Sequence, residues 1–332
     1  MAPRPPWRGR RSRSFVPEAG GPEVQAARRR PKEWTILVGS RSARIRAVSP
    51  SLRPLCALSL NSAICDYRTR VSEIAHTLDG RVVLVTGASR RMVIGAAVAR
   101  RLVADGAGVM LHSWSTYDAE QPWRADPGSP EDLVEELRAA GGRVEHLAAD
   151  LSDPNAPASL VETTYRAFGR LDVAVANHAR SSSQSLEQLS ATEIDFSYAV
   201  NVRATLLLLQ AFARRHDGRR GGRVVLFTSG QYHGAMPDEL PYIATKAALR
   251  ELTPSLAVHL MPRGITVNCI NPGPNDTGYA DPGAIAALAE RSPGGRWSTP
   301  VDTANLIAWL VSDEAEWVTG QTIASDGGWS SR

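Results

Sequence analysis

Short apolar runs alternate with longer amphipathic segments from Leu78 to the end of the chain. The apolar runs are continuously hydrophobic, which is typical of strands that are covered on both faces. Predicted strands cover residues 81–86, 109–112, 143–148, 171–176, 223–228, 265–270 and 321–324. Predicted helices cover residues 95–106, 130–140, 160–168, 194–215, 242–260, part of 276–290, and 301–311. This alternation predicts an α/β fold with a doubly wound parallel sheet of about seven strands and helices on both faces.

Chemically useful residues follow directly after several of the predicted strands. They are Gly87, Asp150, Asn177, Ser229 and Pro272. The carboxyl ends of parallel strands meet at one edge of a sheet, and ligands of such sheets bind there. We therefore expect one site at this edge, built from segments that are far apart in the sequence.

The segment from Ser229 to Lys246 has the strongest candidate chemistry. Tyr242 and Lys246 are four residues apart, so a helix places both side chains on one face. A free phenol has a pKa near ~10, and a nearby ammonium group lowers that pKa by favouring the phenolate. The Ser229 hydroxyl is suited to hold a carbonyl or carbinol oxygen while Tyr242 transfers the proton. Tyr-x-x-x-Lys is common on amphipathic helices, so this interpretation needs support from the other segments.

A glycine-containing turn joins the first predicted strand to the first predicted helix. Gly87 begins this turn, and Gly95 opens the helix. Backbone N–H groups and the helix N-terminus at such a turn bind a pyrophosphate. The turn therefore predicts a Rossmann-like nucleotide site.

Residues 1–78 differ in composition from the rest of the chain. This segment holds 15 Lys and Arg against 5 Asp and Glu, whereas the remaining 254 residues hold 23 and 29. It is rich in Arg, Pro, Gly and Ser and has no sustained period, although residues 34–38 would suit one short strand. We expect a largely disordered basic extension at 1–78, followed by a single Rossmann-fold domain at 79–332.

Four roles for this extension stay open besides disorder alone. Arg10, Arg11 and Phe15 resemble an export signal, but residues 17–22 replace the apolar stretch that such a signal needs. The scarcity of acids suits a transit peptide, whereas the many prolines oppose an amphipathic helix. The segment would also suit a basic arm that touches nucleic acid or membrane. In the fourth alternative, translation begins later in the chain and this segment is not part of the native protein.

The composition disfavours several classes of function. Cys56, Cys65 and Cys269 have neither a disulfide framework nor metal-ligand spacing, so we expect no metal and a reducing compartment, the cytoplasm. No apolar run approaches the ~18 residues of a membrane span, so we expect no membrane. The acidic balance of residues 79–332 gives no reason to expect nucleic acid.

The order and spacing of the motifs resemble the short-chain dehydrogenase/reductase family over about residues 79–330. The resemblance rests on Thr86-Gly87-Ala88-Ser89, Asp150-Leu151, Val175-Ala176-Asn177, Asn201, Ser229, Tyr242-x-x-x-Lys246, Asn271-Pro272-Gly273 and the ending Asp326-Gly327-Gly328-Trp329. Asn201 precedes Ser229 by 28 residues, which matches the family's order. The 3-oxoacyl carrier-protein reductases are similar members of this family.

The resemblance implies a role for each predicted site residue. Tyr242 would be the general acid/base, Lys246 would lower its pKa and hold the nicotinamide ribose, and Ser229 would orient the substrate oxygen. Asn201 would hold a water that links Lys246 to solvent, and Asp150 would bind the adenine edge. The implied cofactor contacts are Gly87, Ser89, Arg90, Arg91, Ile94, Gly95, Asp150, Leu151, Asn177, Tyr242, Lys246, Pro272, Gly273 and Thr277.

The glycine turn departs from the family pattern TGxxxGxG. Gly87 and Gly95 are eight residues apart, so the turn is two residues longer, with Arg90 and Arg91 as the expected insertion. Val93 stands where the family has its middle glycine, and a valine resists φ > 0. We expect the longer loop to avoid that conformation.

Aromatic and histidine side chains near the site have structural interpretations. His178 departs from the family's usual Asn-Asn-Ala-Gly, and we expect it to be structural because no paired acid is evident. Trp114, Tyr117 and Trp123 stand in a predicted loop, where we expect them to pack over that loop; the alternative is that they shape the mouth of the cofactor cleft.

We expect NADP(H) to be preferred over NAD(H), which stays the alternative cofactor. An NAD enzyme places an acid near the end of its second strand, where it binds the ribose hydroxyls and repels a 2′-phosphate. Residues 112–116 contain no acid, and the next acid is Asp118. Arg90 and Arg91 would then receive the 2′-phosphate. In the competing interpretation both arginines are solvated and Asp118 folds back to serve as the acid.

Together these features predict an NAD(P)-dependent oxidoreductase that reduces a ketone or 3-oxoacyl group, or oxidises a secondary alcohol, by hydride transfer. The partner would be a small-molecule carbonyl or alcohol substrate. The resemblance also implies a homodimer or homotetramer, because helices 194–215 and 242–260 commonly pair across subunits in this family. The alternative is a catalytically weak NADP(H)-binding sensor or scaffold protein, which only the altered glycine turn favours.

Overall fold

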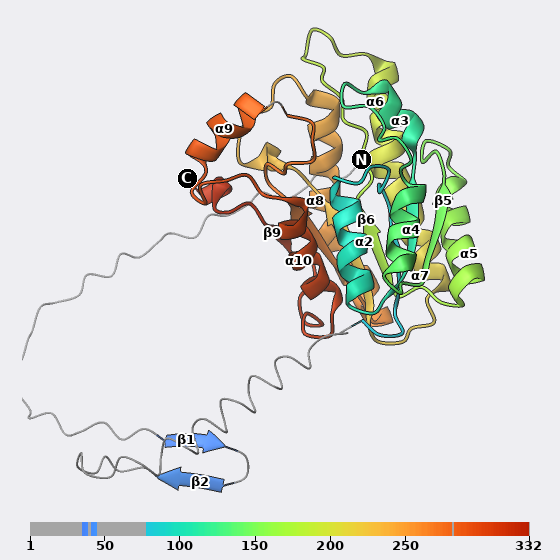
Figure 1. The fold of residues 1–332 in the computed structure, drawn as a ribbon, viewed down its shortest axis with the longest axis vertical. Coiled ribbons are helices and arrows are strands. Elements are labelled where there is room, and N and C mark those ends of the chain that lie inside the picture. The colour runs from blue at the N-terminus through green and yellow to red at the C-terminus, as the bar shows by residue number, and fades with distance from the viewer. Residues whose placement is uncertain (1–34, 39–40, 45–77, 281, 332) are drawn as a thin grey trace, which may run out of the picture. The chain divides into compact units, whose positions relative to one another are not determined.

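The computed structural model describes residues 35–38, 41–44, 78–280 and 282–331. The chain divides into two compact units, Met1–Arg68 and Thr69–Arg332. Figure 1 shows the helices and strands of both units. All the predicted catalytic and cofactor residues belong to the second unit.

A pair of short strands lies in the first unit. β1 (Thr35–Val38) pairs antiparallel with β2 (Arg41–Arg44). β1 consists of strand-favouring residues, whereas β2 has no apolar pattern, so the sequence predicts only the first strand. β1 matches the short strand that residues 34–38 would suit, and the rest of the expectation for the extension lies outside the described residues. Leu78, the last residue of the predicted extension, is fully buried in the core of the second unit.

The second unit is built on one sheet of seven parallel strands, as the sequence predicts. The strands are β3 (Val82–Val85), β4 (Gly108–Ser113), β5 (Val144–Ala148), β6 (Val173–Ala176), β7 (Gly222–Phe227), β8 (Ile265–Asn271) and β9 (Thr322–Ala324). Their order is β5-β4-β3-β6-β7-β8-β9. The strand order reverses at β3, which has β4 on one side and β6 on the other. Nucleotides bind such sheets at the carboxyl ends of the strands beside this reversal.

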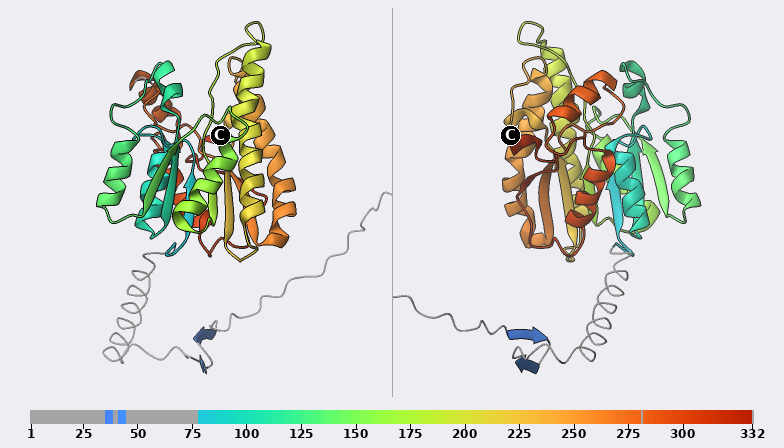
Figure 2. Two further views of the ribbon diagram at one scale, coloured as in Figure 1. Left: turned by 90° about the vertical axis from the view of Figure 1, so that its right-hand side faces the viewer. Right: turned by 60° about the vertical axis from the view of Figure 1, so that its left-hand side comes forward.

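Helices cover both faces of this sheet (Figure 2). One face carries α2 (Ile94–Ala104), α4 (Glu131–Ala139) and α10 (Pro300–Val311), and the other carries α5 (Ala156–Phe168), α7 (Ala204–Arg215) and α8 (Leu240–Leu260). Successive strand residues point to opposite faces. Val83 therefore joins the first core, and Leu84 joins the second. Because both cores are apolar, the strands are continuously hydrophobic.

The helices differ from the prediction at two places. Residues 114–123, which the sequence predicts as a loop, contain α3 (Ser115–Glu120). The predicted helix 194–215 is divided into α6 (Ala191–Tyr198), a π-helical turn η1 (Ala199–Arg203) and α7. A six-residue polar helix gives no clear hydrophobic period, and one π-helical turn barely disturbs such a period. The remaining short elements are η2 (Gly230–Tyr232), η3 (Met261–Arg263), α9 (Pro282–Arg291) and η4 (Trp329–Ser331).

The stretch Ala191–Arg215 is the one helix of the described residues that is long and apolar enough to cross a membrane, with a mean hydropathy of 1.2. Its length and composition alone satisfy that criterion, which core helices also meet. Leu208, Leu209 and Phe212 of this stretch are buried in the core between α7 and the sheet. Packing against the sheet therefore accounts for its apolar character.

Candidate active site

The predicted catalytic residues Ser229, Tyr242 and Lys246 lie together beyond strand β7. Ser229 precedes the turn η2, and the other two lie one helical turn apart on α8. Ser229 opposes in part the rise that burial causes in the pKa of Tyr242, so the two side chains are near neighbours. The Lys246 Nζ lies 5.6 Å from the centre of the Tyr242 ring and donates to the Phe227 carbonyl oxygen at 3.3 Å. The four-residue spacing thus brings a phenol, an ammonium and a hydroxyl to one strand end.

Desolvation controls the protonation of both α8 side chains. Tyr242 is half-buried by surface area, yet its dense surroundings raise its pKa to about 12, against the opposing effect of Ser229. Burial lowers the pKa of Lys246 to about 8. In this geometry desolvation has the larger effect on the Tyr242 pKa, and the lowering expected from Lys246 stays a prediction. The ammonium lies against the ring and donates to Phe227, so desolvation outweighs its effect on the phenol.

Asn201, the fourth predicted catalytic residue, is fully buried in the π-helical turn η1. Its amide nitrogen donates to the Thr245 hydroxyl at 2.9 Å and to the Arg180 carbonyl oxygen at 3.0 Å. Its amide oxygen accepts the Arg180 N–H at 2.7 Å. Asn201 therefore joins α8 to the loop after β6. The water relay through this residue stays a prediction.

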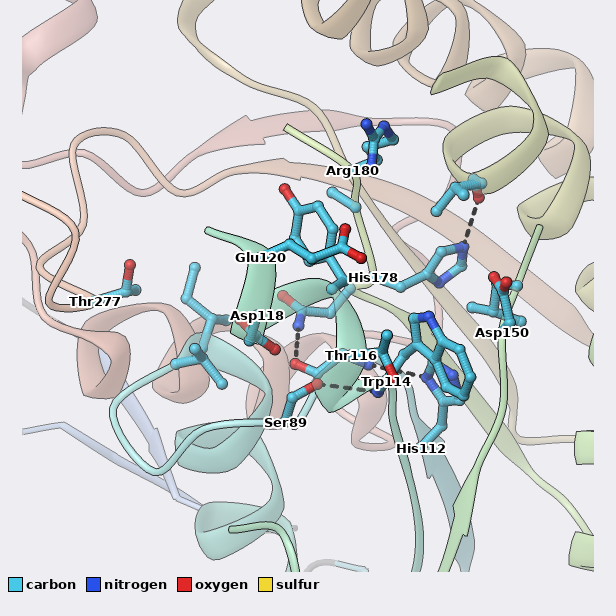
Figure 3. A pocket seen from close by; sticks show the side chains of 18 of the residues that line it. Ser89, His112, Trp114, Thr116, Asp118, Glu120, Asp150, His178, Arg180 and Thr277 are labelled. Carbon is cyan, nitrogen blue, oxygen red and sulfur yellow. Dashed lines mark hydrogen bonds between the residues drawn. The ribbon is translucent and has the colours of Figure 1, made fainter. Parts of the chain in front are cut away.

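A cavity of about 450 Å³ lies where the chain leaves β3, β4 and β6, and Figure 3 shows its wall from close by. Its volume suits a small-molecule site. Half of the predicted cofactor residues line it, namely Gly87, Ser89, Ile94, Asp150, Leu151, Asn177 and Thr277. The other predicted cofactor residues do not, namely Arg90, Arg91, Gly95, Tyr242, Lys246, Pro272 and Gly273. Ser229 and Asn201 also lie outside this lining.

The longer glycine turn has an unstrained backbone. Gly87 has a φ of +73°, and a Cβ there would lie 2.9 Å from the Asn177 side chain. A Cβ on Gly95 would approach the Gly87 carbonyl oxygen to 2.4 Å, so this contact requires glycine. Val93 has a φ of −84°, which confirms that the longer loop avoids a positive φ. No side chain caps α2, so the first amide groups of that helix are available to an anionic ligand.

Asn177 and His178 hold the glycine turn from the end of β6. The Asn177 amide nitrogen donates to the carbonyl oxygens of Thr86 and Gly87 at 3.1 and 2.9 Å. The His178 Nδ1 lies 2.8 Å from the Thr86 hydroxyl, and its Nε2 lies 3.1 Å from the Val200 carbonyl oxygen. Burial lowers the pKa of His178 to about 3, so the ring is neutral at pH 7. This geometry supports the structural role expected for His178.

His112 is a cavity residue that the sequence analysis did not identify. Its Nδ1 accepts the Gly87 N–H at 3.3 Å, and its Nε2 lies 2.9 Å from the Ala149 carbonyl oxygen. These two partners require the proton on Nε2. Burial lowers the pKa of His112 to about 4. The sequence feature that could have identified His112 as a cavity residue is its position at the end of the second predicted strand.

Arg90 and Arg91 are turned away from the cavity, which corrects their expected placement. Arg90 is buried, with its Nε 3.3 Å from the Asp118 carboxylate and a terminal nitrogen donating to the Thr277 carbonyl oxygen at 3.0 Å. Arg91 pairs with Glu136 of α4 at 2.7 Å. The physical reason is that α3 and α4 present carboxylates to the inserted loop. Asp118 lines the cavity, as in the competing interpretation.

Helix α3 and its neighbours supply five cavity residues, of which the sequence analysis offered Trp114, Tyr117 and Asp118 only as alternatives. The segment contributes Trp114, Thr116, Tyr117, Asp118 and Glu120. Trp114 and Tyr117 therefore face the cavity, whereas Trp123 packs beside it and donates from Nε1 to Asp118 at 3.1 Å. The cluster of aromatic residues in a polar segment was the available signal. The remaining lining residues are Val93, His112, His178, Ala179, Arg180, Phe196 and Val200.

The loop after β8 contributes backbone geometry, although Thr277 farther along it lines the cavity. Gly273 has a φ of +64°, and a Cβ there would lie 2.4 Å from the Asp326 Cβ. The Asn271 side-chain oxygen accepts the Gly273 N–H at 3.0 Å. Glycine is therefore needed beside Pro272 because two loops approach each other closely.

No group of three or more His, Cys, Asp or Glu side chains is placed to hold a metal ion in the described part of the chain. Cys269 is fully buried, and burial raises the pKa of its thiol to about 11. The thiol is thus protonated at pH 7 and packs as a small apolar group.

The sequence and the fold have counterparts among known proteins. A family model described as enoyl-(acyl carrier protein) reductase matches residues 87–330. The uncharacterized oxidoreductase YjdA of Bacillus subtilis is 39% identical over 250 residues, or 75% of this chain and 96% of the relative. A cyclohexanol dehydrogenase of a Rhodococcus strain is 36% identical over 267 residues, which cover 76% of this chain and 96% of the relative. The crystal structure of a Burkholderia cenocepacia short-chain dehydrogenase in complex with NADP has a TM-score of 0.68 and 36% identity, covering 76% of this chain and 99% of that chain.

The chain belongs to the short-chain dehydrogenase/reductase family. It is an oxidoreductase, an enzyme that acts on CH–OH or carbonyl groups with a nicotinamide dinucleotide. The sheet of seven parallel strands with helices on both faces is the fold that this chain shares with the solved structures.

Proposed function

We propose that this protein reduces a carbonyl group of a small molecule, or oxidises the corresponding secondary alcohol, with Tyr242 as general acid/base. The observation that carries the proposal is the grouping of Ser229, Tyr242 and Lys246 beyond β7, with Lys246 against the Tyr242 ring. The helix that carries this cluster is joined to the cavity wall, because Asn201 donates to the Thr245 hydroxyl of α8 and to the carbonyl oxygen of the cavity residue Arg180. A proton donor therefore lies beside a pocket of suitable size for a cofactor.

The cavity residues fit a nicotinamide dinucleotide. The uncapped N-terminus of α2 suits the pyrophosphate, while Asp150 and Leu151 suit the adenine. When bound, the cofactor would supply or accept the hydride. NADP(H) is the cofactor we propose, with NAD(H) as the alternative, and the NADP complex of the Burkholderia relative supports this choice. Arg90 and Arg91 do not support the choice of NADP(H), because they pair with Asp118 and Glu136.

The protonation states favour the direction of carbonyl reduction at neutral pH. With a pKa of about 12, Tyr242 is protonated and can donate to a carbonyl oxygen. Ser229 donates a hydrogen bond to the same oxygen and so holds it near the phenol. Lys246, with a pKa of about 8, is largely protonated at pH 7 and stabilises the phenolate that forms.

The substrate is a ketone or a secondary alcohol in this proposal. The name of the Rhodococcus relative specifies an alicyclic alcohol of the proposed class, which supports this choice.

The proposed assembly is a homodimer, or a homotetramer built from it, formed through α6 and α8. Ile194 and Tyr198 of α6 are 36% and 41% exposed. They border an apolar hollow with Leu240 and Ile243 of α8. A second copy of this surface would cover it. Light scattering should give at least the dimer mass for wild type and a smaller mass for Tyr198→Glu, whereas a monomeric wild type would contradict the assembly.

The function is tested by screening ketones, sugars and acyl thioesters with NADPH while its oxidation is followed. Wild type should turn over at least one ketone, and Tyr242→Phe should bind NADPH equally well without turnover. Tight NADPH binding with no turnover of any substrate would favour a sensor or scaffold. Failure to bind either dinucleotide would contradict the proposal.

A further inference from the structure

The side-chain amide of Gln231 holds the backbone of Ser229 through two hydrogen bonds. Its Oε1 accepts the Ser229 N–H at 3.1 Å, and its Nε2 donates to the Thr228 hydroxyl at 2.9 Å. The Thr228 hydroxyl in turn donates to the Lys246 carbonyl oxygen of α8 at 3.0 Å. One chain of hydrogen bonds therefore joins the serine to the helix that carries Tyr242 and Lys246.

The donors and acceptors along this chain allow one orientation of the Gln231 amide. A backbone N–H cannot accept, so the group that faces Ser229 must be the amide oxygen. The Thr228 hydroxyl gives its hydrogen to the Lys246 carbonyl oxygen, so it can only accept from the amide nitrogen. All three bonds run in the same direction, and such chains strengthen their members. The Gln231 side chain is therefore held at both of its polar atoms.

Gln231 supports the main chain of Ser229 and leaves the serine hydroxyl free of that task. Ser229 precedes the turn η2, and a serine at such a position commonly bonds the N–H groups of the turn with its own hydroxyl. Ser229 makes no such capping bond. Its backbone is held by the bond to Gln231 and by its neighbour Thr228, which is 2% exposed. The hydroxyl is thus available to a substrate oxygen.

Gln231 lies outside the wall of the nucleotide cavity. It is half-buried and lines the apolar hollow beside Leu240 and Ile243 of α8 instead. A change at Gln231 therefore reaches the reaction through Ser229 and not through a contact with the dinucleotide.

We propose that Gln231 is a positioning residue that sets the place of the Ser229 hydroxyl beside Tyr242. The inference rests on the function proposed above, in which Ser229 holds the substrate oxygen. A misplacement of about 1 Å in a site of this kind can cost about 10²-fold in rate. Loss of the two Gln231 bonds should therefore lower turnover and leave dinucleotide affinity unchanged.

The test is to measure ketone reduction and NADPH binding by full-length Gln231→Met. Methionine is similar to glutamine in length and suits the apolar hollow, but it makes neither hydrogen bond. The kcat should fall about tenfold to a hundredfold, while the Kd for NADPH stays at the wild-type value.

The matched control is Gln321→Met, which removes the same side-chain amide elsewhere in the chain. The Gln321 Nε2 donates to the Thr319 carbonyl oxygen at 3.0 Å, and Gln321 lines neither the cavity nor the hollow. This control should keep the wild-type kcat.

Two further variants show whether the effect passes through Ser229. Gln231→Glu keeps an oxygen acceptor for the Ser229 N–H, so its kcat should exceed that of Gln231→Met. Ser229→Ala removes the hydroxyl that is positioned, so adding Gln231→Met to it should lower kcat no further. A repeat of the full loss in the Ser229→Ala background, or a Gln231→Glu no faster than Gln231→Met, would overturn the proposal.

A wild-type kcat in Gln231→Met would also overturn it, as would a loss of NADPH binding as large as the loss of kcat. Should Gln231→Met fail to fold, Thr228→Val decides, because it removes the hydroxyl that accepts the Gln231 amide. Its kcat should fall at an unchanged Kd for NADPH, and a wild-type kcat would overturn the proposal.

Failure of this inference differs from failure of the proposed function. Wild type that turns over no ketone contradicts the proposed function, and this inference with it. Wild type that turns over a ketone, with Gln231→Met equally fast, contradicts the positioning role alone.

Discussion

The two halves of the site are positioned by different kinds of interaction. The catalytic half depends on one helix, α8, and on hydrogen bonds among neutral groups and a single lysine. The nucleotide half depends on ion pairs between the inserted loop and helices α3 and α4. Helix geometry follows from local sequence, whereas ion pairs follow from how separate segments meet. The catalytic half can therefore be predicted from residue spacing in the sequence, whereas the ion pairs of the nucleotide half become visible only in the folded structure.

The two halves also differ in how their buried cations are compensated. Arg90 has the Asp118 carboxylate beside it, whereas Lys246 donates its hydrogen bond to a neutral backbone carbonyl oxygen. Burial consequently lowers the pKa of Lys246 to about 8. The catalytic half thus keeps the Lys246 cation without a carboxylate partner, which lowers the stability of the fold. In the nucleotide half, the Asp118 carboxylate balances the charge of Arg90.

The largest expected effect separates catalysis from binding at Tyr242. Tyr242→Phe should lose a factor of about 10²–10⁴ or more in turnover, because positioned proton transfer contributes roughly that much. The fold and NADPH affinity should be retained, since only the hydroxyl is removed. Steady-state kinetics and NADPH titration measure the two effects.

The matched control for this variant is Tyr165→Phe. The Tyr165 hydroxyl donates to the Arg215 carbonyl oxygen at 3.0 Å, and Tyr165 does not line the nucleotide cavity. This variant should keep normal turnover. Wild-type kcat in Tyr242→Phe on a confirmed substrate would remove Tyr242 from the mechanism.

The next effect exposes the cost of the buried lysine. The Lys246 pKa falls from 10.5 to about 8 on folding, so the charged form destabilises the fold by about 3 kcal/mol below pH 8. Lys246→Met should therefore be more stable than wild type at pH 7 while losing activity. Because the unfolded lysine loses its proton near pH 10.5, this stability difference should shrink as pH rises from 8 to 10.5. Denaturant unfolding at pH 7 and pH 10 tests the trend, which a pH-independent difference would contradict.

A smaller effect concerns the histidines under the glycine turn. Burial lowers the pKa of His112 to about 4 and of His178 to about 3, from 6.5 in the unfolded chain. Below pH 6.5 the unfolded state therefore binds more protons than the folded state, so the free energy of unfolding decreases as the pH is lowered. Each histidine should remove about 2 kcal/mol of stability between pH 7 and pH 5. His178→Gln should show a shallower decline, and an unchanged slope would contradict the assignment of His178 as a buried neutral group.

The smallest expected effect lies outside the site. Removal of residues 1–76 should change the unfolding free energy of the second unit by less than about 0.5 kcal/mol and leave activity unchanged. This deletion keeps the buried Leu78. A thermal melt and an activity assay of the shortened chain measure the effect. A large loss of stability would show that the removed segment contributes to the core.

Sequence patterns predicted the sheet, the main helices and the cluster beyond β7 because each depends on local periodicity or fixed spacing. The strands are continuously apolar, and the Tyr242–Lys246 pair needs only one helical turn. Even there the protonation was not readable, because the pKa of Tyr242 depends on how densely the fold surrounds it.

The nucleotide half could not be read in the same way. Arg90 has two charged or polar partners, Asp118 and Thr277, that are 28 and 187 residues away in the chain. Helix α3 is too short to show a period, so the sequence placed Tyr117 and Asp118 in a loop and offered their site roles only as alternatives. The length of an inserted loop does not determine where its side chains point, because the charges they meet come from other elements.

The most direct test of the account follows a deuterium label in a single turnover. Wild type and Tyr242→Phe are mixed with a ketone substrate and NADPH that carries deuterium at the transferable position, and the alcohol is analysed by mass spectrometry. The account predicts one deuterium on the carbinol carbon of the wild-type product and almost no product from Tyr242→Phe, although both proteins bind the cofactor. An unlabelled wild-type alcohol, or labelled alcohol formed at the wild-type rate by Tyr242→Phe, would contradict it.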